Sequence, residues 1–243
     1  MQNKEFWFIV GSQYLYGEDV LKTVEKRAKE MAIFINKKMP TKFIFKGIVK
    51  TSDDATRLIK EANYQDNCLG IVTWCHTFSP SKMWINGLKL LQKPWCHFAT
   101  QYNQEIPNKE IDMDFMNLNQ AAHGDREHGF IGARLRLPRK IIMGYWKDQT
   151  TLTELSNWMR VAYAYSVSQK LNVVRFGDNM RNVAVTEGDK IEAQIKLGWQ
   201  VNTWAVGDLV KEMKKVSDKE IDNLMKTYKS LYEFKTTKLD LVK

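Results

Sequence analysis

The sequence contains few of the residues that mark disulfide-rich, zinc-finger or linker-rich proteins. Its 243 residues include 5 prolines and 3 cysteines. The cysteines form no CxxC pair and no disulfide-like framework, and the scarcity of proline gives no sign of a flexible linker. Cys75 and Cys96 stand inside apolar runs, where we expect them to be small buried residues.

Long apolar runs and a secretory leader are also missing. No run approaches the ~18 apolar residues that a membrane-spanning helix needs. The first ten residues include acidic Glu5 and have no basic n-region. With 44% hydrophobic and 27% charged residues, we therefore expect a globular protein of the cytoplasm, with no membrane partner.

The net charge of +9 raises the question of nucleic acid. The lysines, however, alternate with acidic residues along helix-like stretches, which is typical of solvated helix faces. The sequence has no zinc-finger spacing and no aromatic cluster of an RNA-binding domain. We therefore expect no nucleic-acid partner.

Common catalytic and metal motifs are absent. The sequence has no GxSxG, no Walker A, no GxGxxG and no HExxH, and the loop "GSQYLYG" fails the dinucleotide pattern at its second glycine. His123, Glu127 and His128 could be taken for a metal trio. The two histidines are five residues apart, or ~500° of helical rotation, so they do not share a helix face.

Strand-like and helix-like segments alternate along the chain. Apolar runs at 5–10, 42–49, 68–74, 94–99 and 140–146 predict strands, with amphipathic helices between them. This alternation predicts an α/β fold: a doubly wound, open parallel sheet with Rossmann/flavodoxin-like layers. Ser52 and Ser79 are predicted helix caps, and Thr151 with Glu154 a predicted capping box.

The same pattern restarts near residue 171. We predict an N-terminal α/β domain over residues 1–170. Residues 171–243 contain two further strand-like runs and helices after Gly207 and Ser217. Two strands are few for a sheet, which typically has ~5. Residues 171–243 are therefore predicted to be the incomplete start of a second α/β domain.

Unusual polar and aromatic residues follow four of the predicted strands, at 12–16, 76–78, 100–103 and 178–180. In an open parallel sheet, ligands bind outside the carboxyl ends of the strands. We therefore expect the four clusters on one rim, where amides, hydroxyls, imidazoles and rings suit a neutral polyhydroxylated ligand. Gln120 and His123 are three residues apart and would share a helix face nearby.

Each of these residues also has a purely structural interpretation. Gln13 could cap the next helix, His76 could be a hydrogen-bonded histidine at a strand end, and Phe78 could staple its own helix. Met180 could be ordinary core packing. The coincidence of four clusters favours a binding site over these separate explanations.

Five segments are similar, in the same order, to one known family. They are "GSQYLYG", "WCHTFSPSKMWINGL", "IDMDFMNLNQAAHGDREHGFIGARLR", "RFGDNMRNVAVTEGDK" and "VNTWAVGDL". The sequence resembles the L-arabinose isomerase family from about Glu5 to about Tyr232. Because family members are roughly twice as long, the chain resembles their N-terminal domain and the start of their central domain.

The resemblance implies a set of substrate contacts. In the family, the N-terminal domain reaches over the active site of a neighbouring subunit. The positions that match the family's sugar-facing residues are Gln13, Leu15, Tyr16, Phe78, Gln120, His123 and Met180. Tyr14 stands where the family often has His, and Asp125 and His128 stand where Gly and Phe are common; the matched contacts are unaffected.

The resemblance also implies the reaction, the cofactor and the assembly. The family converts L-arabinose to L-ribulose with a divalent metal, usually Mn²⁺, held by two glutamates and two histidines in the part that would follow Lys243. No catalytic residue or metal ligand is therefore expected in this chain, which alone is expected to be inactive. We expect a homo-oligomer, a hexamer in the family, and a separate C-terminal half could complete the enzyme.

Two alternatives stay open at this stage. One is a non-catalytic sugar-binding or assembly module derived from such an isomerase. The other is an unrelated doubly wound ligand-binding domain. The choice between arabinose and galactose as the preferred sugar also stays open.

Overall fold

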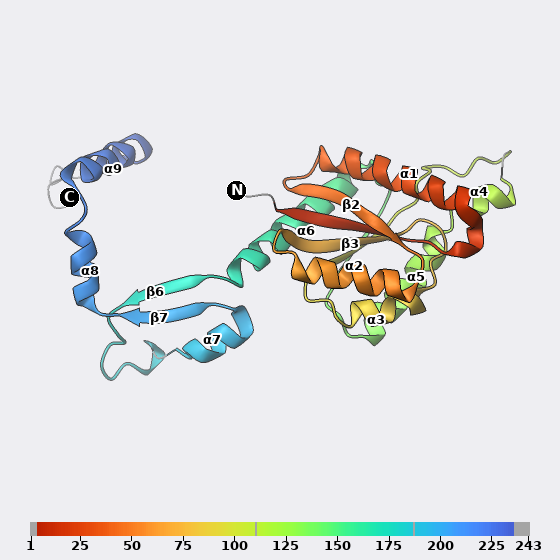
Figure 1. Cartoon of the computed structure of the whole chain (residues 1–243). Helices are drawn as coiled ribbons and strands as arrows, with labels where there is room; N and C mark the ends of the chain where they lie inside the picture. The colour runs from red at the N-terminus through yellow and green to blue at the C-terminus, as the bar shows by residue number, and fades with distance from the viewer. Residues whose placement is uncertain (1–3, 110, 187, 236–243) are drawn as a thin grey trace. The chain divides into compact units, whose positions relative to one another are not determined.

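The computed structural model describes residues 4–109, 111–186 and 188–235 (Figure 1). The chain divides into two compact units, residues 1–166 and 167–243. Each unit is described by itself.

The first unit is built on a five-stranded parallel sheet with the strand order β2-β1-β3-β4-β5. Its strands are β1 (Glu5–Gly11), β2 (Lys42–Val49), β3 (Cys68–Cys75), β4 (Trp95–Ala99) and β5 (Lys140–Met143). The predicted α/β fold with a doubly wound parallel sheet is confirmed. The fifth strand is shorter than predicted, since it ends at Met143.

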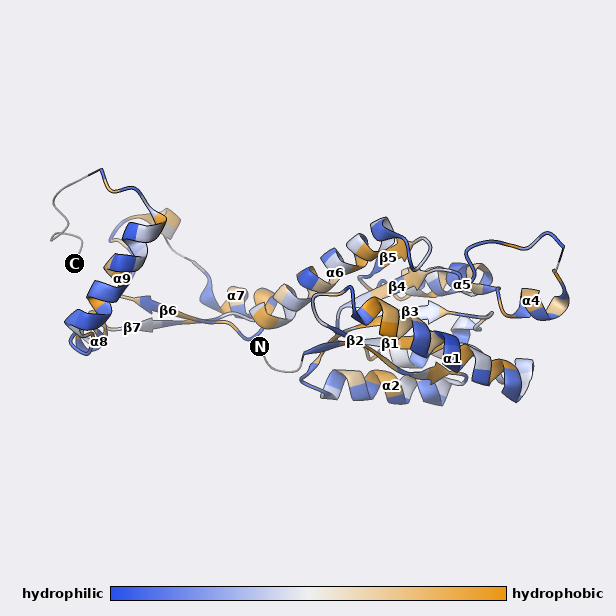
Figure 2. Cartoon of the chain, turned by 90° about the horizontal axis from the view of Figure 1, so that it is seen from above, coloured by the Kyte–Doolittle hydropathy of each residue, from blue (hydrophilic) through white to orange (hydrophobic). Residues whose placement is uncertain are grey.

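Helices cover both faces of this sheet (Figure 1). The helices of the first unit are α1 (Gly17–Asn36), α2 (Ser52–Tyr64), α3 (Ile85–Leu88), α4 (Met113–Asn117), α5 (Ala121–Arg134) and α6 (Gln149–Ser168), with the short 3-10 helices η1 (Tyr14–Tyr16) and η2 (Ser81–Trp84). Of these, α4 lies away from the sheet and buries no residue. In Figure 2 these helices alternate hydrophobic and hydrophilic residues along their length, as expected for helices that bury one side.

The two faces of β1 belong to two separate hydrophobic cores. Phe6 and Phe8 pack in one core with residues of α1 and α6, and Trp7 and Ile9 pack in the other with residues of α2 and α3. Alternate side chains of a strand point to opposite faces, so a central strand between two helical layers must be apolar throughout. This explains why β1 and β3 are buried at every residue.

Three predicted helix caps are wrong. The N-cap of α2 is Thr51, whose hydroxyl accepts a hydrogen bond from the amide of Asp54 at 3.1 Å, and Ser52 is the first helical residue. Ser79 caps no helix; its buried hydroxyl accepts a hydrogen bond from the indole of Trp84 at 3.2 Å. Because α6 already begins at Gln149, Thr151 lies inside it and forms no capping box.

The second unit contains a separate two-stranded parallel sheet, and both predicted strands are confirmed. Its elements are β6 (Asn172–Phe176), η3 (Ala184–Thr186), α7 (Lys190–Leu197), β7 (Gln200–Trp204), α8 (Val206–Met213) and α9 (Asp218–Leu231). Ser217 and Glu220 form a capping box at the start of α9. Among the described residues of this unit, Met225 is the only hydrophobic side chain in the buried class.

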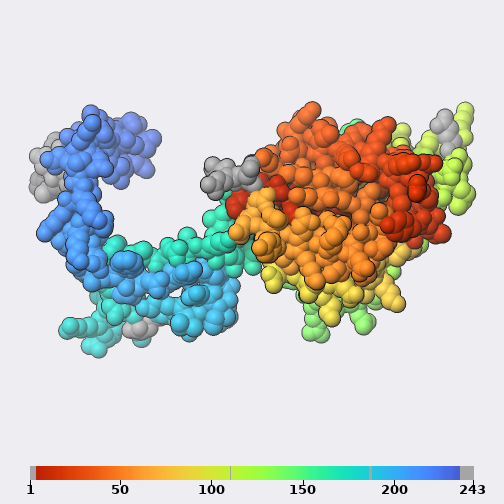
Figure 3. All heavy atoms as spheres, in the orientation of Figure 1, coloured from red at the N-terminus to blue at the C-terminus, as the bar shows by residue number. Residues whose placement is uncertain are grey.

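The side chains of the first unit pack densely on the face that the space-filling view shows (Figure 3). Its core is rich in large aromatic residues, and Trp7, Trp74, Trp84, Trp95 and Trp146 are all almost fully buried. In the part of the chain that the structure describes, no helix has the length and apolar character needed to cross a bilayer.

Candidate functional site

The loops after β1 and β3 lie side by side at the carboxyl edge of the sheet. Gly11 and Cys75, the last residues of these strands, are register partners. Beyond them, the buried hydroxyls of Ser12 and Thr77 are hydrogen-bonded at 2.8 Å. The approach requires a glycine, because a Cβ on Gly11 would lie 2.3 Å from Oγ of Ser79.

The first loop presents Gln13, Leu15 and Tyr16. Gln13 stands just before η1, but its side chain makes no capping hydrogen bond, so the capping interpretation is wrong. Leu15 is 83% exposed and Tyr16 is half-buried. Three predicted sugar-facing side chains therefore share one loop at the edge of the sheet.

Phe78 and His123 form the second part of the edge. Their rings stack with centroids 4.3 Å apart and planes at 19°. His123 is exposed, so it does not pack inside the helix layer. Gln120 is the N-cap residue of α5, and its amide donates a hydrogen bond to Oδ1 of Asn117 at 3.2 Å.

Met180 lies in the other unit. It follows β6 and is 69% exposed, so the core-packing interpretation is wrong. The clusters after β1, β3 and β4 share the edge of one sheet, whereas β6 pairs only with β7 in a second sheet. The shared rim therefore holds for the clusters after β1, β3 and β4, and the place of Met180 beside them stays a prediction.

A cavity of about 570 Å³ lies at the carboxyl ends of β4 and β5. Side chains from the loop after β4, from α5 and from the end of β5 line it, among them Gln101, Asn103, Asp125, Arg126 and Tyr145. The buried Oε1 of Gln101 and Oδ1 of Asn103 have no hydrogen-bond partner among the described residues. The cavity therefore presents unused hydrogen-bond acceptors.

His76 is buried between two aromatic rings. Its ring centroid lies 4.7 Å from that of Trp74 and 6.4 Å from that of Tyr102. Burial, reinforced by the nearby charge of Arg27, lowers the pKa of His76 to about 3. Among the described residues, neither ring nitrogen has a hydrogen-bond partner outside His76 itself, so the interpretation of a hydrogen-bonded histidine is wrong.

A chain of polar side chains crosses the face of the sheet under α5. Nε2 of His97 lies 2.9 Å from Oδ1 of Asp125, and its Nδ1 lies 3.0 Å from the hydroxyl of Thr73. The same hydroxyl lies 3.3 Å from Nε2 of His128, whose Nδ1 lies 3.4 Å from Oγ of Ser81. The indole of Trp95 donates to Thr73 at 2.9 Å.

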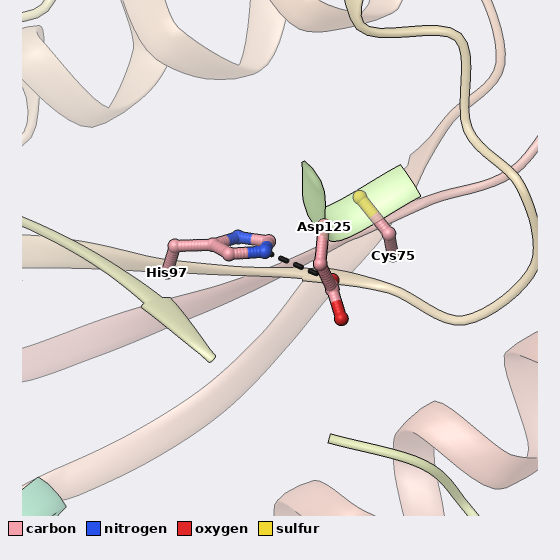
Figure 4. A group of neighbouring side chains, drawn as sticks. All are labelled: Cys75, His97 and Asp125. Carbon is pink, nitrogen blue, oxygen red and sulfur yellow. Dashed lines mark hydrogen bonds and ion pairs between the residues drawn. The ribbon is translucent and has the colours of Figure 1, made fainter. Parts of the chain in front are cut away.

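Cys75 stands beside this chain (Figure 4). One ligand atom each from Cys75, His97 and Asp125 lies within 4.8 Å of the other two. Gly124 allows the approach of α5, because a Cβ there would lie 2.8 Å from Cβ of Cys75. Burial raises the pKa of the Cys75 thiol well above its usual value, and the carboxylates of Asp125 and Glu127 raise it further.

No motif in the sequence indicated this group. The predicted burial of Cys75 is confirmed, but its neighbours were not predicted. The available signal was His97, a polar residue inside an apolar strand, which requires a partner when buried. In the register, His97 is the partner of Thr73 on β3, so Cys75, two residues further, shares the same face.

The metal trio considered from the sequence does not converge. His123 is exposed and stacks on Phe78, whereas His128 is buried against Trp84 and Trp95. Glu127 accepts a hydrogen bond from the amide of Ser81 at 2.8 Å. The side chains of His123, Glu127 and His128 therefore point into different surroundings.

Two family models match the chain. One, the L-arabinose isomerase N-terminal domain, matches residues 1–170, and the other, the L-arabinose isomerase central domain, matches residues 172–241. The chain belongs to the L-arabinose isomerase family. The resemblance seen in its motifs is thereby confirmed.

Curated members of the L-arabinose isomerase family are similar over almost the whole chain. L-arabinose isomerase 1 of Clostridium acetobutylicum is 55% identical over 236 residues, which are 96% of this chain and 48% of that protein. L-arabinose isomerase of Thermotoga maritima is 52% identical over 96% of this chain and 47% of its own length. L-arabinose isomerase 2 of Bacillus licheniformis is 53% identical over 95% and 49%. The chain spans about half the length of the curated relatives it matches.

Proposed function

We propose that this chain forms the N-terminal half of an L-arabinose isomerase, which interconverts L-arabinose and L-ribulose. The main support is a sequence identity of 55% to a protein named L-arabinose isomerase 1, over 96% of this chain. The grouping of Gln13, Leu15, Tyr16, Phe78, Gln120 and His123 at one edge of the sheet supports it, because such an edge is where α/β sheets bind ligands.

In this proposal the edge residues bind and orient the sugar. The amides of Gln13 and Gln120 and the imidazole of His123 both donate and accept hydrogen bonds, as sugar hydroxyls do. Leu15, Tyr16 and Phe78 cover the C–H surfaces of the sugar and exclude water. Met180 would add a contact from the second unit.

The described residues do not fit the Mn²⁺ that the resemblance implies. Among them, a single group combines three His, Cys or carboxylate ligands, and it includes the buried thiol of Cys75. Mn²⁺ prefers carboxylate and other oxygen ligands over thiolate. We therefore place no step of the isomerisation on a metal held by this chain, and we propose that the Mn²⁺ ligands and the catalytic base lie outside it.

The proposal also includes the oligomeric state of the protein and its location in the cell. Exposed apolar side chains of the second unit, such as Trp204 and Val210, would be covered in a homo-oligomer, which we propose to be a hexamer with active sites between subunits. We further propose that the protein works in the cytoplasm. Sedimentation of the chain at high concentration should reveal self-association, and a clean monomer would contradict this part. We expect the apolar patch that drives this association near residues 200–243, of which residues 236–243 lie outside the described residues.

An isomerase assay tests the proposal. The chain is incubated with L-arabinose and Mn²⁺, alone and together with the C-terminal half of a relative, and ketose formation is measured. We expect ketose only in the completed mixture. Activity of the chain alone would show that the catalytic residues are present after all.

The alternative is a non-catalytic sugar-binding or assembly module. The stacked Phe78–His123 pair favours this alternative as much as it favours the enzyme, since both need a sugar contact. Calorimetry of the chain with L-arabinose and D-galactose separates them. Sugar binding by the chain without activity of the completed mixture would favour the module.

A further inference from the structure

We propose that Cys75, His97 and Asp125 form a binding site for one Zn²⁺ ion. The three side chains come from the end of β3, from β4 and from α5, so an ion there would tie two strands to the helix that covers them. The proposal does not depend on the isomerase function.

The distances suit one small ion. Nε2 of His97 and Oδ1 of Asp125 are 2.9 Å apart, and no two ligand atoms of the trio are more than 4.8 Å apart. Zinc binds nitrogen, oxygen and sulfur at ~2.0–2.3 Å, so its ligand atoms stand ~3–4 Å from each other. Closing the group around an ion requires a shift of about 1 Å.

The chemistry of the ligands selects the metal. A thiolate, an imidazole and a carboxylate are the three donor types that Zn²⁺ takes in proteins, whereas the thiolate disfavours Mg²⁺, Ca²⁺ and Mn²⁺. Three protein ligands leave one position of a tetrahedral ion for water. Asp125 also lines the cavity at the carboxyl ends of β4 and β5, which in this proposal is the route by which the ion and this water reach the site.

The hydrogen-bond chain behind His97 is compatible with both the metal-free and the metal-bound form. Thr73 has one hydroxyl proton and already accepts a hydrogen bond from Trp95. It therefore donates to one of the two histidines, His97 or His128, and accepts a hydrogen bond from the other.

In the first arrangement Thr73 donates to Nδ1 of His97, so Nε2 of His97 carries a proton and donates it to Asp125. In the second arrangement, Thr73 donates its hydroxyl proton to Nε2 of His128, and Nδ1–H of His128 donates to Oγ of Ser81. Nδ1–H of His97 then donates to the hydroxyl oxygen of Thr73. Nε2 of His97 then directs a lone pair at the Asp125 carboxylate, a repulsive contact that a cation between them makes attractive. Such an outer hydrogen bond from the second ring nitrogen is usual for zinc-bound histidine.

The negative charges near Cys75 also favour a bound cation. The Cys75 thiol is fully buried, with the carboxylates of Asp125 and Glu127 near it. A divalent cation would stabilise the thiolate and the carboxylates together, and on binding the thiol would release its proton to solvent.

Cobalt and zinc titrations of the full 243-residue chain test the site. Co²⁺ bound to a thiolate gives a near-ultraviolet charge-transfer band, which reports the sulfur ligand directly. We expect this band at one equivalent and its loss on displacement by Zn²⁺. Cys75→Ser should abolish the band, whereas Cys96→Ser, at a buried cysteine on the neighbouring strand, should retain it.

Zinc affinity, measured by competition with a chromophoric chelator, supplies the second readout. Asp125→Asn keeps the size of the side chain and should weaken binding by about a hundredfold or more, beyond the 10–100-fold typical for loss of an outer hydrogen bond. If Cys75→Ser fails to fold, as judged by circular dichroism, the zinc affinity of Asp125→Asn tests the proposal instead. An absent band in the parent chain, a band that survives Cys75→Ser, or an unchanged zinc affinity in Asp125→Asn would each overturn the proposal.

Discussion

The two units of this chain share the same local pattern but differ in what they bury. In the first unit, all seven residues of β1 are buried. In the second unit, no residue of β6 or β7 belongs to the buried class. All three strands lie in parallel sheets, but β6 (NVVRF) and β7 (QVNTW) mix polar with apolar residues, and even their Val174, Phe176 and Trp204 are exposed. An apolar side chain in a strand is therefore not buried by strand formation alone.

The difference follows from the number of strands and layers. The five-stranded sheet has helices on both faces, and its helices bury one side each against it. A two-stranded sheet offers little surface to pack against and is marginal by itself. Trp204 is therefore 50% exposed and Leu224 51% exposed, although both occur in regular elements. An apolar residue becomes part of a core only when enough layers surround it.

The largest expected contrast is in amide hydrogen exchange. Amides of β3 should exchange only through global unfolding, which for a domain requires ~5–15 kcal/mol. Amides of β6 should exchange through local opening at much lower free energy, so they should be less protected by about a thousandfold or more. Hydrogen exchange read by mass spectrometry measures both in one sample. Equal protection would mean that the second unit is covered, for example in an oligomer, and dilution would then reveal the contrast.

Matched leucine substitutions should show the same contrast in stability. Leu58 on α2 is 2% exposed and Leu224 on α9 is 51% exposed. Leu58→Ala should lower the free energy of unfolding by about 2–5 kcal/mol, because it leaves a cavity in a packed core. Leu224→Ala should change it by less than ~0.5 kcal/mol. Urea unfolding measures both, and a loss of more than 1 kcal/mol in Leu224→Ala would contradict the description of the second unit.

Burial of the His76 side chain should make the stability of the first unit depend on pH. The pKa of His76 is about 3 in the folded protein, below its ordinary 6.5. Between these values the unfolded chain binds a proton that the folded protein does not bind. The stabilisation is therefore complete above pH 6.5 and is lost as the pH falls towards 3, by up to ~1.4 kcal/mol per pH unit.

Replacement of this histidine tests the assignment. His76→Phe fills a similar volume and cannot titrate, so the stability lost between pH 7.5 and 5.5 should shrink by about 1 kcal/mol. His128, whose pKa burial lowers well below its usual value, should keep part of the dependence. An unchanged pH dependence in urea unfolding would show that His76 is protonated or exposed in solution.

The smallest expected effect concerns His123, on the exposed edge. In the enzyme completed with a C-terminal half, His123→Ala should weaken sugar binding several-fold to tenfold, since a lost neutral hydrogen bond corresponds to ~0.5–1.5 kcal/mol. Metal affinity should be nearly unchanged. Arg134→Ala, at an exposed position of the same helix, is the matched control. Calorimetric titrations with sugar and Mn²⁺ measure both affinities, and a large loss of Mn²⁺ affinity would show that His123 is a ligand.

The same titration compares the two units directly. The resemblance places Met180 of the second unit among the sugar contacts, so Met180→Ala should also weaken sugar binding. A loss in His123→Ala without a loss in Met180→Ala would confine the sugar site to the first unit.

Much of the fold and part of the edge could be predicted from the sequence. The apolar runs of β1 and β3 predict strands buried on both faces, because they lack the alternation of a half-exposed strand. The loops that carry Gln13 and Phe78 could be placed at one edge, because strands of a parallel sheet end on the same side. These features depend on residues that are close in sequence.

Other features were decided only by the tertiary structure. Cys75, His97 and Asp125 are distant in sequence and converge because β3 and β4 pair in one register and because Gly124 lets α5 approach. The isolation of His76 between Trp74 and Tyr102 likewise depends on packing across strands. Periodicity describes which side of an element is apolar. Which side chains meet, and which apolar sides remain uncovered, depends on contacts between elements that no local pattern contains.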